Sequence, residues 1–308
     1  MSTDPQHLID TGALSSDWLQ SVFTVASQLL ATGAPPPATN QRQVSLLFAE
    51  ASTRTKASFW AAAQLLGWPI TDYDLGQSSL AKGESLLDTL TNLAALGSEL
   101  AVLRLPHSDG LNRAVLAARE SGQKLPVLVN AGQGIQGHPT QSLLDLYTIW
   151  RDCQQDWQKL KTKRLLILGD LDHSRVLRSW LPLARVAAME LIISGPTSLA
   201  QGPWPKSVKY IADLATALAQ VDYVLVLRVQ SERLSGGVLN RQNYQQYYRL
   251  DHQLLQARPA LKVLHPGPVV NDYELSRELS IDPKVSLIGE QVRLGPSLRA
   301  AVMQQLLR

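Results

Sequence analysis

Four consecutive residues, Ser52, Thr53, Arg54 and Thr55, have the side chains that proteins use to bind phosphate. They combine hydroxyl groups with a guanidinium, and the apolar helical spacing that follows places them at the start of a helix. A helix start offers unpaired N–H groups and a partial positive charge, which favour an anion. An ordinary capped helix with a surface arginine has the same local pattern, so this stretch alone does not decide between a phosphate site and a simple helix cap.

The elements around these residues are predicted from the apolar pattern. Residues 44–48 form an apolar run that indicates a buried strand. Ser52 is a good helix N-cap, residues 57–66 have helical apolar spacing, and Gly67 is placed to end the helix. A strand followed directly by a helix would thus deliver the hydroxyls and the arginine to one point.

The same strand-then-helix pattern recurs along the chain. Repeated alternation of this kind predicts parallel sheets with helices on both faces and binding sites at the carboxyl ends of the strands. Arginine binds phosphate and carboxylate with two parallel hydrogen bonds. Several arginines at such strand ends therefore predict a pocket for multiply anionic ligands. Four arginines directly follow a predicted strand: Arg54, Arg104, Arg175 and Arg228.

A histidine is expected at another helix start. Residues 127–129 form a short apolar strand, and Pro139 suits the first turn of the helix that follows a glycine-rich segment. This places His138 at a helix N-terminus, where the dipole disfavours the charged imidazole and a neutral ring can donate a hydrogen bond. A capping histidine without chemistry is the equal alternative. We expect the helix from about residue 139 to 155 to lead into a second domain.

Two polar segments are predicted as flexible loops, residues 76–85 and residues 235–247. The first contains Lys82, for which a solvated surface lysine is the simplest interpretation. A chain of 308 residues with 45% hydrophobic content has room for two ordinary cores. Residues 289–307 are predicted to form an amphipathic C-terminal helix.

Composition excludes several classes of protein. Cys153 is the only cysteine, so an internal disulfide and a cysteine-based zinc cluster are excluded. No apolar run approaches the roughly 18 residues that span a membrane, and the first residues carry no signal-peptide pattern; both favour the cytoplasm. A net charge of +3 without a basic, aromatic stripe does not favour nucleic acid. The segment beginning Gly169-Asp170 lacks the later glycines of a dinucleotide fingerprint.

The motifs, taken together, resemble those of the aspartate carbamoyltransferase catalytic subunits, in the aspartate/ornithine carbamoyltransferase superfamily. The resemblance runs along nearly the whole chain, and several motifs in the family's order are far more specific than any one alone. They are F-A-E-A-S-T-R-T-K, S-S-L-A-K-G-E-S, L-R-L-P, N-A-G-Q-G-I-Q-G-H-P-T-Q-S-L-L-D-L-Y-T, G-D-L-D-H-S-R-V, L-R-V-Q-S-E-R and H-P-G-P-V.

This resemblance implies an α/β fold of two doubly wound parallel-sheet domains joined by long helices, with the active site in the interdomain cleft. Residues 1–142 would form a carbamoyl phosphate-binding domain on which the C-terminal helix, residues 288–308, packs back. Residues 143–287 would form an aspartate-binding domain. The implied reaction transfers the carbamoyl group of carbamoyl phosphate to L-aspartate in pyrimidine synthesis, without a cofactor or a metal.

The resemblance also implies roles for residues of the carbamoyl phosphate half. The implied phosphate ligands are Ser52, Thr53, Arg54 and Thr55. Thr55, Arg104 and His138 would polarise the carbamoyl oxygen, and with Arg54 they would form the catalytic set. The carbamoyl amide would contact Gln141 and the backbone around Pro266 and Gly267.

For the aspartate half, Arg175, Arg228 and Gln230 would bind the two carboxylates of the substrate. Lys82 and Ser78 or Ser79 would reach into the site of a neighbouring subunit, which implies a homotrimer with shared active sites. Glu50 and Arg233 are expected to pair with arginines and hold a closed state. Regulatory subunits or a dihydroorotase are candidate further partners, between which the sequence does not decide.

Four departures from the family pattern bear on the alternatives. Ala51, Leu105 and Gln133 replace common family residues, and residues 269–272 replace an arginine-bearing segment. An ornithine carbamoyltransferase would share the phosphate half but usually carries His-Cys-Leu-Pro where this chain has His265-Pro266-Gly267-Pro268. A non-catalytic scaffold homologue is the other alternative, supported only by residues 269–272. The residues implied to contact substrate are all retained.

Overall fold

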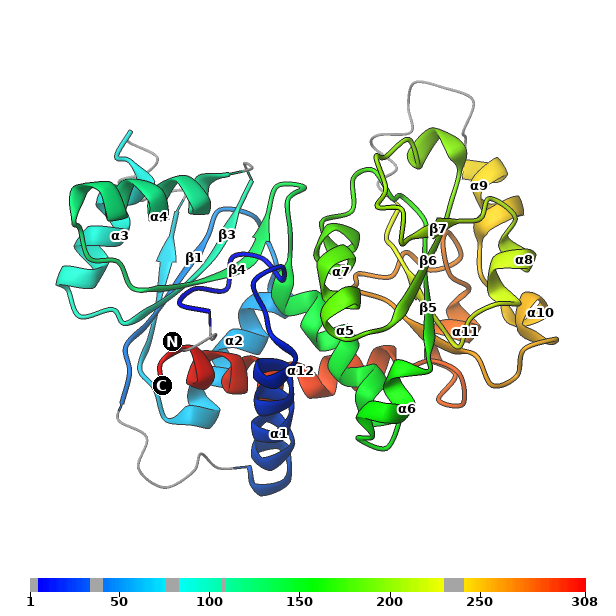
Figure 1. Cartoon of the computed structure of the whole chain (residues 1–308), viewed down its shortest axis with the longest axis horizontal. Coiled ribbons are helices and arrows are strands. Elements are labelled where there is room, and N and C mark those ends of the chain that lie inside the picture. The colour runs from blue at the N-terminus through cyan, green and yellow to red at the C-terminus, as the bar shows by residue number, and fades with distance from the viewer. Residues whose placement is uncertain (1–4, 34–40, 76–82, 107–108, 230–240) are drawn as a thin grey trace. The chain divides into compact units, whose positions relative to one another are not determined.

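The computed structural model of the chain describes residues 5–33, 41–75, 83–106, 109–229 and 241–308. The chain divides into two compact units. Unit 1 comprises Met1–Leu144 and Leu294–Arg308, and unit 2 comprises Asp145–Arg293. The chain passes from one unit to the other inside two helices, α5 (Pro139–Asp152) and α12 (Ile288–Leu306) (Figure 1).

Unit 1 is built on a parallel sheet of four described strands in the order β2-β1-β3-β4. The strands are β1 (Val44–Phe48), β2 (Ile70–Asp74), β3 (Leu100–Leu105) and β4 (Val127–Gln133). The strand predicted at residues 44–48 is confirmed at those bounds, and the apolar run at residues 100–105, which also predicts a strand, forms β3 at its own bounds. The prediction for β4 was too short, because its polar end, Asn130 to Gln133, is as buried as its apolar start.

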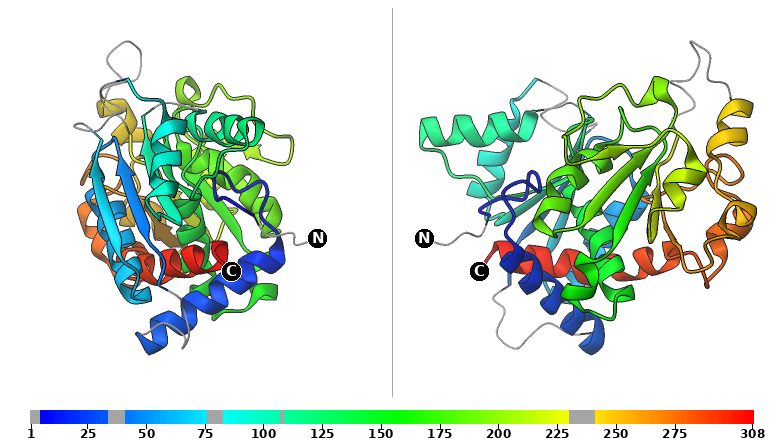
Figure 2. Two further views of the ribbon diagram at one scale, coloured as in Figure 1. Left: turned by 90° about the vertical axis from the view of Figure 1, so that its left-hand side faces the viewer. Right: turned by 45° about the vertical axis from the view of Figure 1, so that its right-hand side comes forward.

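Helices cover both faces of this sheet (Figures 1 and 2). Side chains that alternate along the strands, such as Leu47, Leu103 and Leu128, pack in one core cluster with α3 (Leu86–Ala95) and α4 (Gly110–Ser121). On the other face of the sheet, the first described helices along the chain are α1 (Ser16–Thr32) and α2 (Thr53–Leu66). The alternation of buried residues thus produces the expected doubly wound arrangement.

The C-terminal half of α12 belongs to unit 1. Arg299 Nη1 donates to Ser58 Oγ at 2.7 Å, and its guanidinium lies over the ring of Phe59 on α2. Gln305 Nε2 donates to Ser21 Oγ on α1 at 2.8 Å. Gly295 permits the close approach of α12 to α2, because a Cβ there would lie 2.8 Å from Ser58 Oγ.

Helix α4 follows β3, where the repeated strand-then-helix pattern predicts a helix without giving its bounds. Asp109, its N-cap residue, is in the left-handed conformation with φ 68°, and its own side chain makes no capping hydrogen bond. With its side-chain amide turned over, Gln133, at the end of β4, accepts from the N–H groups of Asp109 and Gly110 at 2.7 and 2.8 Å.

Unit 2 is built on a second parallel sheet, with described strands in the order β7-β6-β5-β8-β9. The strands are β5 (Arg164–Leu168), β6 (Glu190–Ser194), β7 (Lys209–Tyr210), β8 (Tyr223–Val226) and β9 (Lys262–Leu264). The two-residue strand β7 was not predicted. The other four agree to within one residue at their ends with the strands that apolar runs predict, at residues 164–168, 190–194, 223–227 and 261–264.

The helices of unit 2 also lie on both faces of its sheet (Figure 2). Besides α5, the described ones are α6 (Trp157–Lys161), α7 (Arg175–Val186), η2 (Thr197–Leu199), α8 (Leu214–Leu218), α9 (Arg241–Tyr248), α10 (His252–Leu255) and α11 (Arg277–Ile281). None of the chain's described helices is long and apolar enough to cross a membrane.

Helix α9 corrects the prediction of a loop over residues 235–247, since residues from 241 onward are helical. The segment is polar, and its pattern gave only a weak helix signal. It is held by one buried side chain, Tyr244, which packs against Tyr273 and Val229. Burial raises the pKa of Tyr244 well above that of an ordinary tyrosine, with the nearby Glu274 carboxylate as a further cause.

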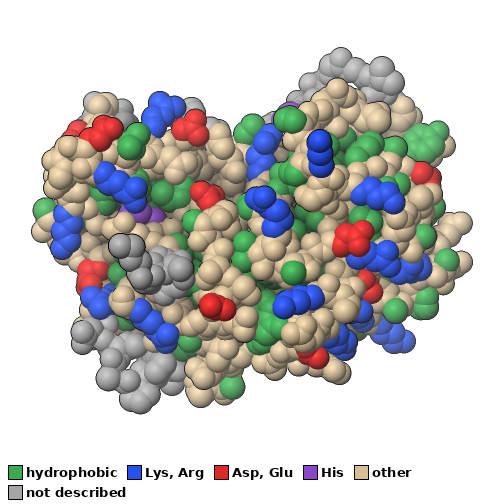
Figure 3. All heavy atoms as spheres, in the orientation of Figure 1, with side chains coloured by type: hydrophobic (Ala, Val, Ile, Leu, Met, Phe, Trp, Pro, Cys, Tyr) green, Lys and Arg blue, Asp and Glu red, His purple; other side chains and the backbone are tan. Residues whose placement is uncertain are grey.

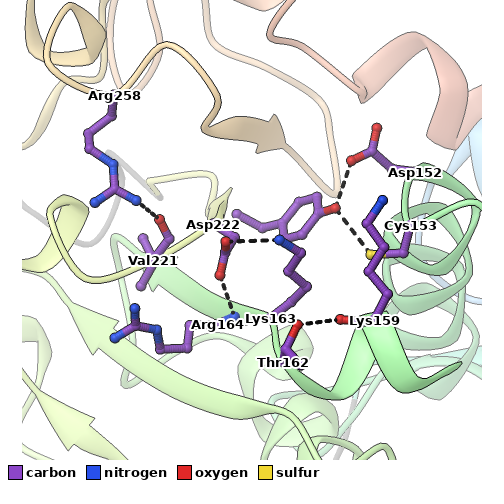
Figure 4. Close-up of polar contacts among 10 residues, drawn as sticks. Asp152, Cys153, Lys159, Thr162, Lys163, Arg164, Val221, Asp222 and Arg258 are labelled. Atoms are coloured by element: carbon purple, nitrogen blue, oxygen red, sulfur yellow. Dashed lines mark hydrogen bonds and ion pairs between the residues drawn. The ribbon is translucent and has the colours of Figure 1, made fainter. Parts of the chain in front are cut away.

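A network of polar contacts fixes the amino-terminal ends of strands in the unit 2 sheet (Figure 4). The Tyr223 hydroxyl donates to Asp152 Oδ2 at 2.6 Å and lies 3.4 Å from Cys153 Sγ. Asp222 accepts from the Arg164 N–H at 2.9 Å and from Lys163 Nζ at 3.2 Å. Burial raises the pKa of both the Tyr223 hydroxyl and the Cys153 thiol. These contacts fasten β8 to β5 and to the end of α5.

Candidate active site

In unit 1 the predicted phosphate residues lie at a switch point of the sheet. The chain order β2-β1-β3-β4 means that the connections leaving β1 and β3 run in opposite directions. Ligands of doubly wound sheets bind in the crevice at the carboxyl ends of such strands. The segment after β1 contains Ser52 to Thr55, and Arg104 lies near the end of β3, so the topology brings both to one place.

The predicted phosphate residues lie at the start of α2. Ser52 is the N-cap residue, as predicted, but among the described residues its side chain accepts no capping hydrogen bond. Gly67 ends the helix in the left-handed conformation, also as predicted. Thr55 is buried, with 7% of its surface exposed. Arg54 is exposed; partial desolvation lowers the pKa of its guanidinium, although an arginine stays a cation at neutral pH.

Arg104 is held in place by two neighbours. Its Nε atom lies 3.2 Å from Glu50 Oε2, and only 11% of its side chain is exposed. Its Nη1 atom donates to the Ala131 carbonyl oxygen, in β4, at 3.2 Å. The backbone also joins the two strand ends, because the Ala49 N–H donates to the Arg104 carbonyl oxygen at 2.9 Å. Glu50 therefore pairs inside unit 1, with an arginine that is itself a predicted site residue.

His138 and Gln141 lie at the start of α5, after β4, which is the neighbour of β3. Both are buried. The His138 carbonyl oxygen accepts from the Gln141 N–H at 3.0 Å, so the residue caps the helix through its backbone. Its Nδ1 atom lies 3.4 Å from Thr140 Oγ1. The capping and chemical interpretations of His138 are thus compatible, because the cap uses the carbonyl group and not the ring.

In unit 2 the order β7-β6-β5-β8-β9 places the switch point between β5 and β8. Arg175 is the first residue of α7, in the connection that leaves β5, and Arg228 follows β8. Ser174 caps α7, with its Oγ accepting from the Leu177 N–H at 3.0 Å. Arg228 is exposed and Arg175 is half-buried. Both arginines predicted to bind aspartate therefore lie at the switch point of their own sheet.

The loop between β5 and α7 contains polar residues that sequence reasoning did not single out. Buried Asp170 accepts from the His173 N–H at 3.3 Å, and its Oδ1 lies 2.8 Å from His173 Nδ1. Asp172 accepts from the N–H groups of Gln201 and Gly202 at 2.9 and 3.0 Å. These bonds hold the loop that carries Arg175. The sequence signal that could have identified Asp170 was an aspartate just after a predicted strand.

The segment from His265 to Pro268 follows β9, next to β8. Pro266 and Gly267 are half-buried, and Gly267 has φ 71°, a conformation that favours glycine. Five residues predicted for the site or its closed state lie outside the described residues: Ser78, Ser79, Lys82, Gln230 and Arg233. The roles of all five thus stay predictions.

The four arginines predicted to bind anions are divided between the units: Arg54 and Arg104 belong to unit 1, and Arg175 and Arg228 belong to unit 2. On the face drawn in Figure 3, basic side chains are interspersed with acidic and apolar ones. Within the part of the chain that the structure describes, no group of three or more His, Cys, Asp or Glu side chains could hold a metal ion. The arrangement in each unit is suited to positioning an anion and stabilising charge.

Comparison with protein-family models gives two adjacent matches. Residues 6–151 match the aspartate/ornithine carbamoyltransferase carbamoyl-P binding domain, and residues 161–306 match the Asp/Orn binding domain. A relative from Nocardioides sp., an aspartate carbamoyltransferase catalytic subunit, is 38% identical over 98% of this chain and 94% of its own length. The catalytic subunit from Prochlorococcus marinus is 34% identical over 99% and 98%.

Solved structures are similar over the same extent. The catalytic subunit of M. jannaschii aspartate transcarbamoylase is 26% identical, with a TM-score of 0.79 and 98% of each chain covered. Aspartate transcarbamoylase from Trypanosoma cruzi in complex with carbamoyl phosphate is 26% identical, with a TM-score of 0.80 over 97% of this chain and 95% of that one. The family resemblance of the motifs is confirmed, and this chain belongs to the aspartate/ornithine carbamoyltransferase family.

Proposed function

We propose that this protein transfers the carbamoyl group of carbamoyl phosphate to the amine of L-aspartate, giving N-carbamoyl-L-aspartate and phosphate. The observation that carries the proposal is the switch point of unit 1. There a helix start, with Ser52 whose side chain makes no capping hydrogen bond among the described residues, Arg54 and buried Thr55, follows the strand next to the one that carries Arg104. The relatives, named as aspartate carbamoyltransferases, support the choice of reaction.

The phosphate of the substrate would be bound by the first residues of α2. Ser52 and Thr53 supply hydroxyls, Arg54 supplies charge, and the amide groups of the helix start face the same anion. Because phosphate is the leaving group, holding it also stabilises the negative charge that it gains as the C–O bond breaks. No strong general acid is then required.

The carbamoyl carbon becomes tetrahedral when the aspartate amine attacks it, and its oxygen gains negative charge. In the proposed mechanism Thr55, Arg104 and His138 stabilise that oxygen. The C–N bond forms, the C–O bond to phosphate breaks, and the leaving phosphate takes the proton of the amine. Donors that are fixed before the reaction stabilise such charge without reorganising. The contacts of Arg104 with Glu50 and the Ala131 carbonyl provide that fixation.

Aspartate would be recognised by Arg175, Arg228 and Gln230 in unit 2. Guanidinium groups suit two carboxylates, whereas a cationic side chain such as that of ornithine would be repelled. One Trypanosoma cruzi aspartate transcarbamoylase of similar fold is described in complex with aspartate and phosphate, at 26% identity and a TM-score of 0.79. The sequence His265-Pro266-Gly267-Pro268 also differs from the His-Cys-Leu-Pro typical of ornithine enzymes.

A carbamoylation assay with aspartate and ornithine side by side tests this function. We expect turnover with aspartate and none with ornithine, measured as phosphate release together with the carbamoylated product. Turnover of ornithine alone would assign the other branch of the family. Turnover of neither substrate by folded protein would favour a non-catalytic scaffold.

The active assembly is proposed to be a cytoplasmic homotrimer in which Ser78 or Ser79 and Lys82 complete a neighbour's site. Mixing inactive Lys82→Ala and His138→Ala proteins should therefore restore part of the activity, because hybrid trimers contain some sites with neither substitution. The measurement is specific activity after subunit exchange, verified by native mass spectrometry. No recovery in spite of proven exchange would contradict shared sites, and the same mass measurement would reveal regulatory or dihydroorotase partners.

A further inference from the structure

We propose that His265 and Glu274 are positioning residues that together fix the backbone of Pro266 and Gly267. The inference rests on the proposed function and on the family resemblance, which implies that this backbone contacts the amide of the carbamoyl group. Backbone atoms cannot adjust by changing rotamer, so their placement depends entirely on what holds the loop. The described contacts around residues 265–270 show how it is held.

The imidazole of His265 turns back on its own loop. The Gly267 N–H donates to His265 Nδ1 at 2.7 Å. A backbone N–H can only donate, so Nδ1 carries no proton while this bond exists. The ring proton then lies on Nε2, which is 3.2 Å from Glu274 Oε1. One tautomer thus satisfies both contacts, and the side chains of His265 and Glu274 are both fully buried.

Glu274 closes the loop from its other end. The same oxygen, Oε1, accepts from the Val270 N–H at 2.7 Å. One carboxylate oxygen therefore holds the start of the loop through the His265 ring and its end through Val270. Hydrogen bonds to an ionised acceptor are stronger than neutral ones, and a buried acceptor has no water to replace a lost partner. Glu274 should act as the anchor of the segment.

The base of the loop is fixed separately, by residues of the two helices in which the chain changes unit. The His265 N–H donates to Gln291 Oε1, on α12, at 3.0 Å. Gln291 Nε2 donates to Asp145 Oδ1, on α5, at 2.7 Å, and Asp145 Oδ2 accepts from Trp180 Nε1 at 3.2 Å. These contacts leave the backbone of His265 anchored when its ring or Glu274 is changed. Substitutions of the pair should therefore move the loop and not unfold the unit.

Two substitutions separate the hydrogen bonds from the charge. Glu274→Leu removes the acceptor for both His265 and Val270. Glu274→Gln keeps the shared acceptor oxygen, and its amide nitrogen replaces Oε2, which has no hydrogen-bond partner among the described residues. We expect Glu274→Leu to lower kcat/KM for carbamoyl phosphate about 100-fold, as a displacement of about 1 Å can. Glu274→Gln should restore most of that loss.

Tyr223→Phe is the matched control. It removes a buried hydroxyl that donates to Asp152, at the opposite, amino-terminal end of the strands of the same sheet. Loss of thermal stability is expected for both Glu274→Leu and Tyr223→Phe, but only the former should change kcat/KM. Amide exchange should also become faster at Gly267 and Val270 in Glu274→Leu, and stay unchanged at those two positions in Tyr223→Phe.

The outcomes are distinguishable from failure of the proposed function. If the wild-type protein does not carbamoylate aspartate, the proposed function itself is wrong. If it does, wild-type kcat/KM in folded Glu274→Leu would overturn the positioning role. Equal damage in Glu274→Gln and Glu274→Leu would overturn the assignment to hydrogen bonds. Should Glu274→Leu not fold, His265→Asn replaces it, because asparagine keeps an acceptor for the Gly267 N–H and loses the hydrogen bond to Glu274. An unchanged kcat/KM in His265→Asn would overturn the inference.

Discussion

Two helices that start at switch points, α2 in unit 1 and α7 in unit 2, use the same residue type differently. Ser174 caps α7, with its hydroxyl accepting from the Leu177 N–H at 3.0 Å. Ser52 occupies the cap position of α2, but among the described residues its hydroxyl makes no such bond. A serine at a helix start is thus a structural cap in one unit, whereas in the other it makes no such cap among the described residues and is the one proposed to bind phosphate.

Substitution of Arg54 tests the proposed role of the α2 helix start and should have the largest effect of the variants compared here. Arg54→Ala removes the guanidinium proposed to hold the leaving phosphate, while its exposed side chain leaves little packing to lose. We expect turnover to fall by about a hundredfold or more, with an unchanged melting temperature. Steady-state kinetics and a thermal melt measure both quantities. Retention of more than about a tenth of the wild-type rate would contradict a role of this size.

Arg175→Ala tests the corresponding position of unit 2. Loss of a charged hydrogen bond of about 1.5–3 kcal/mol should raise the KM for aspartate by about 10- to 150-fold. Binding of carbamoyl phosphate, measured by calorimetry without aspartate, should stay unchanged. Weakened carbamoyl phosphate binding would show that the two arginines do not serve different substrates.

Ser52→Ala should affect catalysis and spare stability. The lost hydroxyl is proposed to bind phosphate, so we expect a roughly tenfold higher KM for carbamoyl phosphate. The melting temperature should change little, because the helix loses no capping bond. A lower melting temperature with an unchanged KM would identify Ser52 as an ordinary cap.

Ser174→Ala should have the smallest effect, and it should change stability and not catalysis. Removal of a capping hydroxyl costs about 1 kcal/mol, which corresponds to roughly 2–4 °C in melting temperature for a domain of this size. The KM for carbamoyl phosphate should be unchanged. Thermal melts of Ser52→Ala and Ser174→Ala under the same conditions provide the direct comparison.

Much of the fold follows from local patterns in the sequence. The strands β1 and β3, the cap positions Ser52 and Gly67, and the placement of arginines after strands were all predictable, because each depends on neighbouring residues. The start of helix α4 shows where local patterns stop. Asp109 occupies its cap position without a side-chain capping bond, and the oxygen that can accept there, with the amide turned over, belongs to Gln133, which is distant in sequence.

The candidate site shows the same limit. The residues proposed to contact substrate lie in recognisable motifs, whereas the residues that support them do not. Glu274 follows His265 by nine positions, and only the path of the loop reveals that they form a pair. Glu50 was expected to pair with an arginine, but its partner within unit 1, Arg104, depends on the register of β1 and β3.

The discontinuity of unit 1 has a consequence for biosynthesis. A ribosome delivers residues in chain order, so unit 2, Asp145–Arg293, is complete before the last segment of unit 1 emerges. Until then α2 lacks Arg299, which contacts both Ser58 and Phe59, and the core lacks buried Leu298 and Val302. The nascent phosphate-binding half should therefore mature last, although it is translated first, and truncation of the final helix should leave it incompletely folded.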